Sequence, residues 1–261
     1  MYYSTGLEYL VSSYKSPSYS PNISYFSKFT DDNYSPEMQP AIISGTAYSW
    51  KNNQSHYGIN SKPYHTTYSS NHSFTPELFL NPIRPRARFI DDSTEVRKIA
   101  EQIFELMLKQ KMPDEVSINV LPFEEFKDAH SKFGRWNNGI LGFSINGEVK
   151  KVFVRENHLD MLLLVIAHEI GHVISESLLN AHDEEAKAFA FAFEWAKTIK
   201  QHNLENLGQN IKDEIDFQPA RNGLHDVAFS FVDFMVKKGI KAIDLHRDLA
   251  KKYVSVFNKC Y

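Results

Sequence analysis

The sequence predicts an α+β domain preceded by a long extension without regular structure. Eleven of the thirteen tyrosines lie before residue 70, among serine, asparagine and proline residues. That composition offers too few aliphatic side chains to offset the conformational entropy of ordering. After about residue 87, segments with helical periodicity and segments with strand periodicity both occur. We therefore expect residues 1–86 to be a disordered extension and residues 87–261 to form one domain.

The domain is expected to open with a helix, a strand and a short helix. Asp92 and Glu95 have the spacing of a capping box, and apolar residues follow at helical intervals, which predicts a helix over 93–110. Apolar and polar residues then alternate over 116–120, as in a half-buried strand. A short helix is expected next, over 122–130.

A hairpin and two long helices are expected to follow. Asn146-Gly147 separates two apolar runs, at 139–145 and 149–154, and is a strong turn signal between paired strands. A helix is then expected over 159–179 and another over 183–202. Two amphipathic helices that pack on the domain are expected at the C-terminus, over 224–238 and 240–257.

Charge and cysteine content exclude several classes of function. A formal net charge of −3 does not favour nucleic acid, an anionic membrane or an acidic substrate. The basic residues Arg84, Arg86 and Arg88 are interpreted as a solvated linker rather than a docking patch. Cys260 is the only cysteine, so the fold does not need an oxidising compartment. The longest aliphatic run, 161–167, cannot span a bilayer, and no secretory signal is recognisable, so a cytoplasmic protein is expected.

The pentapeptide His168-Glu169-Ile170-Gly171-His172 carries the chemistry. Histidines four residues apart project from one face of a helix, where both imidazoles can reach one metal ion. Glu169 is placed to accept a proton from a metal-bound water without binding the ion itself. Zinc makes such a water acidic enough to supply hydroxide near neutral pH. These residues predict a zinc centre with Glu169 as general base.

A third ligand is needed to complete the site while leaving a position for water. Glu185 is the preferred candidate, because small alanines around it permit close packing against the motif helix. Glu194 is a rival on geometry, since in an antiparallel helical hairpin it lies nearer the level of the histidines. His182 and Asp183 also remain open. Glu185 requires the motif helix to end early and the connection to be longer than predicted.

These residues resemble a known family of metallopeptidases. The pentapeptide followed by Glu184-Glu185-Ala186-Lys187-Ala188-Phe189-Ala190 is similar to the ImmA/IrrE-type enzymes, which belong to the gluzincins. The resemblance covers roughly residues 93–200. It implies a zincin-like fold with a small antiparallel sheet, zinc bound by His168, His172 and Glu185, and Glu169 as the base.

Two further features of the site are expected but not assigned. Stabilisation of the oxyanion usually needs a donor beyond the metal, and His225, Arg221 and His158 are unranked candidates. One strand of the hairpin, 141–145 or 150–154, could pair with an extended substrate.

The expected function is zinc-dependent hydrolysis of peptide bonds in a protein or peptide substrate. An alternative is a regulatory or scaffold protein with a structural metal, in which the extension is the working part. A third hypothesis is a zymogen whose extension folds into the cleft, with His56, His65 or His72 capping the zinc.

Overall fold

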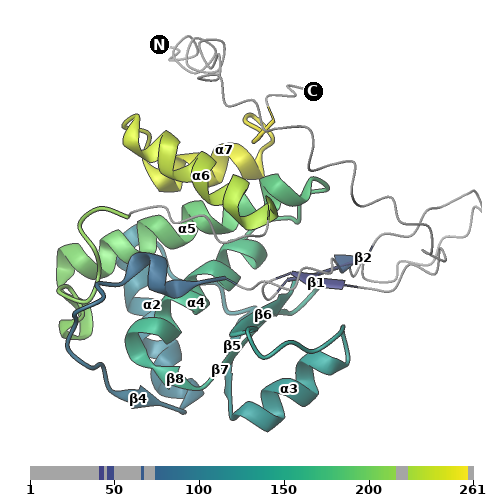
Figure 1. Ribbon diagram of the computed structural model, residues 1–261, viewed down its shortest axis with the longest axis vertical. Coiled ribbons are helices and arrows are strands. Elements are labelled where there is room, and N and C mark those ends of the chain that lie inside the picture. The colour runs from purple at the N-terminus through teal and green to yellow at the C-terminus, as the bar shows by residue number, and fades with distance from the viewer. Residues whose placement is uncertain (1–40, 44–45, 50–65, 68–73, 216–222, 258–261) are drawn as a thin grey trace, which may run out of the picture. The chain divides into compact units, whose positions relative to one another are not determined.

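The computed structural model describes residues 41–43, 46–49, 66–67, 74–215 and 223–257 (Figure 1). Within these ranges the chain forms an α+β fold with six α-helices, as expected. The helices are α2 (Ser93–Leu108), α3 (Phe123–Ser131), α4 (Leu159–Val173), α5 (Ala181–His202), α6 (Gly223–Lys237) and α7 (Ala242–Ala250), with 3-10 turns η2 (Pro76–Phe79) and η3 (Leu204–Asn206). The strands are β1 (Ala41–Ile43), β2 (Thr46–Ser49), β3 (Thr66–Thr67), β4 (Phe89–Ile90), β5 (Val116–Leu121), β6 (Gly142–Ile145), β7 (Lys150–Arg155) and β8 (Asn157–His158).

The main sheet has the strand order β1-β2-β6-β7-β5, with β3 paired to β2. The predicted hairpin is confirmed, because β6 and β7 are antiparallel neighbours on either side of Asn146-Gly147. The expected purely antiparallel sheet is wrong, since β5 runs parallel to β7 and β2 runs parallel to β6. The chain between β5 and β7 contains α3 and β6, and a connection of that length permits a parallel pairing.

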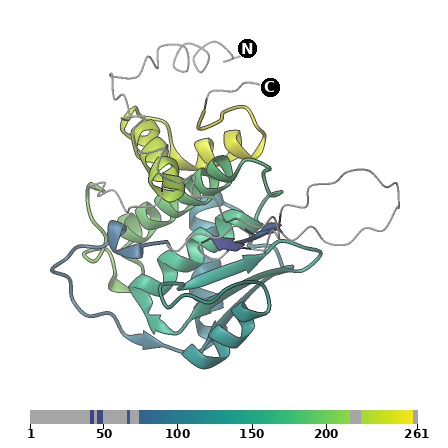
Figure 2. The ribbon, with the colours of Figure 1, turned by 45° about the vertical axis from the view of Figure 1, so that its right-hand side comes forward.

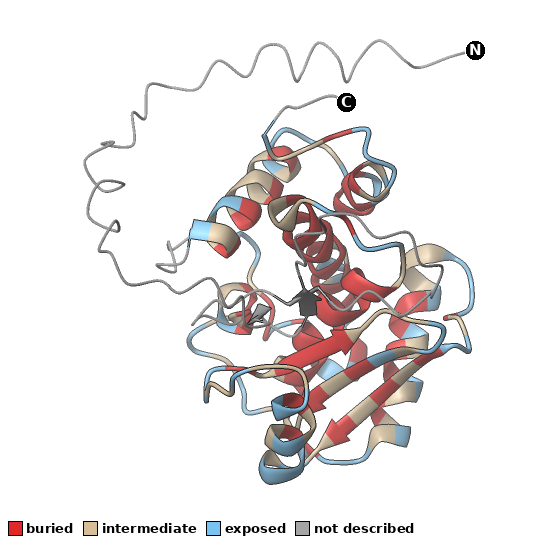
Figure 3. Ribbon diagram, turned by 90° about the vertical axis from the view of Figure 1, so that its right-hand side faces the viewer, coloured by how far each residue is buried: buried red, intermediate tan, exposed pale blue. Residues whose placement is uncertain are grey.

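The two faces of the sheet pack against different helices. Successive strand residues point to opposite faces, so each face buries its own apolar side chains. Val152 and Val154 of β7 join the main core with α4, whereas Phe153 packs with Phe126 of α3 and Phe143 of β6. The alternation of buried and less buried residues along the strands is visible in Figure 3.

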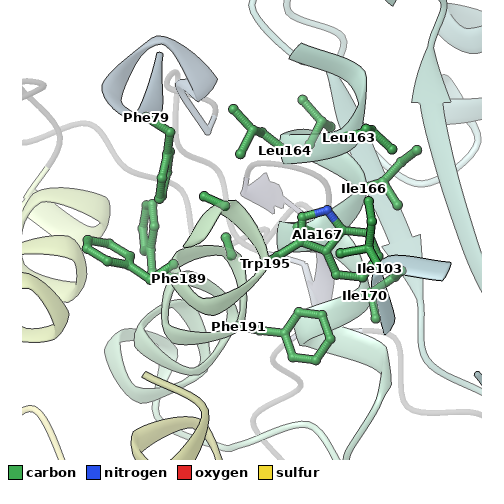
Figure 4. Close-up of a cluster of buried hydrophobic side chains, with 14 of the residues drawn as sticks. Phe79, Ile103, Leu163, Leu164, Ile166, Ala167, Ile170, Phe189, Phe191 and Trp195 are labelled. Atoms are coloured by element: carbon green, nitrogen blue, oxygen red, sulfur yellow. The ribbon is translucent and has the colours of Figure 1, made fainter. Parts of the chain in front are cut away.

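The helix α4 forms the centre of the domain. Every residue of it except Met161 is buried, as is typical of a helix that is apolar on all sides. Side chains from α5 pack against it, and Figure 4 shows Trp195 of α5 beside Ala167 and Ile170 of α4. The helices α6 and α7 (yellow) lie on the side of α5 that faces away from the sheet (Figures 1 and 2).

The folded domain extends further toward the N-terminus than the predicted boundary at residue 87. Phe74, Phe79 and Leu80 are buried in the main core at 3%, 0% and 1% exposure, and β1–β3 lie in the main sheet. The sequence did not predict this earlier boundary, because a few mostly aromatic side chains, rather than a periodic aliphatic pattern, anchor the segment in the core. The other residues assigned to the extension lie outside the described ranges.

Arg86 and Arg88 are exposed, as expected of a solvated segment, but Arg84 and Arg88 make ion pairs that the sequence did not predict. Arg84 Nε lies 2.7 Å from Asp160 Oδ2, and that carboxylate is 2% exposed at the start of α4. Arg88 pairs with Glu95 and with Glu205. These ion pairs fasten the segment across the N-terminal end of α4.

The C-terminal helices correct one boundary. The helix α6 agrees with the expected 224–238, but α7 ends at Ala250 rather than near 257. Lys252 adopts a positive φ of 62°, which breaks the helical path. Among the described residues, no helix is both long and apolar enough to cross a bilayer.

Candidate metal centre

The two histidines of the pentapeptide lie side by side on α4. His168 Nε2 and His172 Nε2 are 3.2 Å apart, and both residues are 0% exposed. Their one-turn spacing on the helix brings the rings together, as the sequence predicted. Two imidazole nitrogens that face each other across this distance in a dry interior need a shared partner.

The helix α4 ends earlier than expected, and this brings Glu185 close to the two histidines. It ends at Val173 instead of near Leu179, and α5 begins at Ala181 after the N-cap Asn180. The connection therefore leaves α4 one residue after His172, at Val173, and leads into α5. Glu185, the fifth residue of α5, then lies level with the histidines, so the geometric argument for Glu194 no longer holds.

Side chains from other elements hold this connection in place. Asn146 Nδ2 donates to the carbonyl oxygen of Ser175 at 2.8 Å, and Lys187 Nζ donates to that of Glu176 at 2.9 Å. The carbonyl groups after the helix end are thus satisfied without another helical turn. Neither partner is close in sequence to the end of α4, which explains why local pattern predicted a longer helix.

Glu185 is the residue that joins the two histidines. Its Oε2 lies 3.3 Å from His168 Nε2, and its Oε1 lies 3.9 Å from His172 Nε2. His168, His172 and Glu185 form a buried group in the described residues that could hold a metal ion, with ligand atoms within 4.8 Å of one another.

The other candidates for third ligand lie elsewhere. Glu194 pairs with Lys197 at 3.7 Å on α5 and lines a separate cavity of about 520 Å³. Asp183 accepts a hydrogen bond from the backbone of Val256, and His182 packs against the ring of Phe257.

Gly171 allows the two helices to meet closely enough for this. A Cβ at Gly171 would lie 2.8 Å from Ala188 Cα and 2.9 Å from Phe191 Cβ. The absence of a side chain lets the backbones of α4 and α5 touch one turn beyond Glu185. This close contact sets the position of Glu185 along the axis of α4, at the level of His168 and His172.

Glu184 makes a contact with His172 that the sequence analysis did not predict. Its Oε1 lies 2.9 Å from His172 Nδ1, while its Oε2 accepts hydrogen bonds from the Leu178 backbone and from Lys187 Nζ. All of these groups are buried. A metal-binding imidazole usually gives its other nitrogen to a carboxylate or carbonyl. That requirement was the available signal, since an acidic residue had to lie near His172 Nδ1.

Glu169 lies beside the three donors and under the sheet. It is 1% exposed, and the Ser144 hydroxyl is the side-chain group that acts on its carboxyl by hydrogen bonding. A Cβ at Gly142 of β6 would lie 3.2 Å from Glu169 Cγ, so this strand passes directly over it. Burial raises the pKa of Glu169 well above its usual range, with the Ser144 hydroxyl opposing that rise and Glu185 adding to it.

The charges of the donor set suit a cation. Burial acts to raise the pKa of Glu185, but His225, His168 and His172 together hold it below its usual range. Burial lowers the pKa of His168 and, more strongly, that of His172. An ionised carboxylate and two neutral imidazoles are the forms that bind a metal ion.

Of the two oxyanion candidates that the structure describes, His225 lies at the centre and His158 does not. His225 lies in the first turn of α6, and its Nε2 is 3.0 Å from Glu185 Oε2. His158 precedes α4 and its Nδ1 contacts the carbonyl oxygen of Ala87, roughly 15 Å along the helix from His168. Arg221 lies outside the described residues, as do His56, His65 and His72.

Phe74 completes the enclosure of the centre. Its ring stacks on the ring of His168, with centroids 4.4 Å apart and an interplanar angle of 19°. No periodic pattern in the sequence indicated this contact. With Phe74 in place, His168, His172, Glu169 and Glu185 are each at most 1% exposed.

The description of the metal centre rests on the residues of this chain and not on a comparison with known proteins. No protein family, curated protein or solved structure matches this chain.

Proposed function

We propose that this chain is a zinc-dependent peptidase of zincin-like fold that hydrolyses peptide bonds in a protein or peptide substrate. The observation that carries the proposal is Glu169, a carboxyl group only 1% exposed, next to His168 and beside the donor set. A site that only holds a metal for structure has no use for such a carboxylate.

The donor spacing fits zinc. Tetrahedral zinc at about 2.0–2.1 Å from each ligand places its ligands roughly 3.3 Å apart. The three observed separations are 3.2 Å between the imidazoles, and 3.3 Å and 3.9 Å from the imidazoles to Glu185. Three protein ligands leave a fourth position for water or substrate, as in catalytic zinc sites.

Each residue then has a defined role. Zinc, when bound, would supply an acidic water near neutral pH. Glu169 accepts the proton of the attacking water, holds it on its carboxylate and returns it to the nitrogen of the departing amine. His225, whose Nε2 lies 3.0 Å from Glu185 Oε2, would donate a hydrogen bond to the oxygen on which negative charge develops. Glu184 holds the ring of His172 in orientation.

The arrangement around the centre supports the zincin-like assignment. The motif helix lies under a sheet whose strand β6 runs antiparallel to β7 beside the proposed base. The resemblance of the motif and of Glu184–Ala190 to the ImmA/IrrE-type metallopeptidases points the same way. The single cysteine suits a reducing compartment, and we place the protein in the cytoplasm.

The test compares metal content and peptidase activity in the wild type and three glutamate variants. Glu169→Gln is expected to keep its zinc and lose about 10²–10⁴-fold in rate, the usual contribution of a general base. Glu185→Gln is expected to lose zinc and activity together. Glu194→Gln, the matched control on the same helix, is expected to retain both. Zinc in the wild type with an unchanged rate in Glu169→Gln would sink the proposal and favour a structural metal.

A further inference from the structure

We infer that the edge of β6 that faces away from β7 is a surface on which an extended peptide can add as a strand. In this structure the chain's own strand β2 occupies that edge. That this edge is also the substrate edge rests on the proposed function. The pairing itself stands on the geometry of the sheet.

The first observation is the position of β2 in the sheet. One edge of β6 is paired with β7, and the other is paired with β2 through Thr46 and Ser144. Without β2, alternate N–H and C=O groups of β6 would be unpaired along that edge. Such an edge is a template on which another extended chain can add as a strand.

The second observation places this edge at the chemistry. Gly142 and Ser144 lie on the face of the sheet that covers α4, and both are next to Glu169. A peptide that pairs along β6 would therefore pass beside the proposed base. At Ser144 that path is taken by β2, whose Thr46 is its register partner.

A third observation, from another part of the same N-terminal region, agrees with these. Phe74 is 3% exposed and covers the ring of His168, the first metal donor. Phe74 also contacts Phe79 and Phe189, so its position is fixed by the core of the domain. The region thus touches both the strand edge and a metal donor.

The consequence is a centre closed by its own chain. With each of the four central residues at most 1% exposed, a substrate cannot reach them while both contacts are made. Opening the site requires β2 to leave β6 and Phe74 to leave His168. Strand β2 is therefore an intramolecular competitor for an extended peptide substrate, and Phe74 covers the first histidine of the group.

The test of the pairing is hydrogen exchange of the full-length chain, read on peptides that contain β6. The double variant Thr46→Pro/Ala47→Pro removes the N–H groups of two successive residues of β2. Because successive N–H groups on a strand point to opposite edges, one of the two faces β6. The amides of β6 that face away from β7 should then exchange about tenfold faster or more. The control Thr46→Ser/Ala47→Ser should leave exchange unchanged. Equal exchange in the proline variant and its control would overturn the inference, with or without peptidase activity.

The test of closure is the rate at which a chromogenic chelator extracts zinc from the loaded full-length protein. Phe74→Ala and the proline variant should each release zinc at least about tenfold faster than wild type, because local opening controls access to a buried site. Phe74→Leu should stay near the wild-type rate. Unchanged extraction in both opened variants would contradict closure. Because this rate needs no substrate, a failed peptidase assay would leave the result readable.

Discussion

Glu184 is the neighbour of Glu185 in sequence, and its side chain contacts His172. Its carboxylate connects His172 Nδ1, the backbone of Leu178 and the ammonium of Lys187, all in the dry interior. A buried carboxylate with both oxygens hydrogen-bonded is rigid, so it fixes the ring of His172 with Nε2 facing His168 and Glu185.

We predict that Glu184→Gln lowers zinc affinity about 10–100-fold, the range found when the outer partner of a metal-binding histidine is lost. The glutamine keeps the volume but cannot accept from all three partners. Affinity is measured by competition with a chelator of known strength. The comparison variant is Lys187→Met, which breaks the same ion pair and removes the donor to the Glu176 carbonyl, but leaves the contact from Glu184 to His172. An equal loss of affinity in both variants would show that Glu184 acts only through folding.

At the scale of elements, the centre depends on how closely α4 approaches α5. The contact runs through Gly171, where a Cβ would meet Ala188 and Phe191 at less than 3.0 Å. The neighbouring atoms belong to the backbone and to a Cβ, so they cannot turn aside as a flexible side chain would.

Gly171→Ala is therefore predicted to lower the free energy of unfolding by about 1–3 kcal/mol, the usual cost of overpacking. It should also weaken zinc binding, because pushing α5 away lifts Glu185 from the histidines. Urea denaturation and zinc titration measure the two effects. Gly223→Ala makes the same chemical change where nothing lies within 4 Å, and it should be neutral or slightly stabilising. A Gly171→Ala protein as stable as wild type would refute the close-contact argument.

Which elements the sequence could predict depends on how local their causes are. The positions of α2, α5, α6 and the β6–β7 hairpin follow from short-range periodicity, a cap and a turn dipeptide, and the prediction was close. The end of α4 depends on Asn146 and Lys187, which reach its terminal carbonyls from other elements. The choice between Glu185 and Glu194 depended on that end, so it stayed open in the sequence.

The same reason explains what was missed around the site. His168, Glu169 and His172 are recognisable because the chemistry lies within one turn of one helix. Phe74 is recognisable only when the fold brings it onto His168. Its segment has no periodic apolar pattern, and composition alone assigned it to the extension.

At the scale of the whole molecule, acid is expected to destabilise the fold through buried neutral histidines. His130 is 0% exposed among aromatic rings, and burial lowers its pKa to about 4. Burial also lowers the pKa of His246 to about 4. In the unfolded chain both titrate near 6.5, so between pH 6.5 and pH 4 the unfolded state binds more protons. The free energy of unfolding must therefore fall as the pH drops through that window.

For His130 alone, the loss between pH 7 and pH 5 is about 2 kcal/mol. The variant His130→Leu should show a fall smaller by about that amount in urea denaturation at the two pH values. The control His202→Leu removes an exposed histidine at the end of α5 and should leave the fall unchanged. A variant with the wild-type dependence on pH would mean that His130 is charged or solvated in the native state.

The donor set lies entirely within residues 168–185, on one helical hairpin, whereas Phe74 stands 94 residues before His168 in the chain. Contacts between close neighbours in sequence form early in folding, and contacts across long loops form late. The helical hairpin would then form first and could bind its ion before Phe74 covers His168. The aromatic cover would arrive afterwards and turn a readily exchanging ion into a trapped one. The moment of synthesis, rather than the finished protein, would then decide which metal the chain carries.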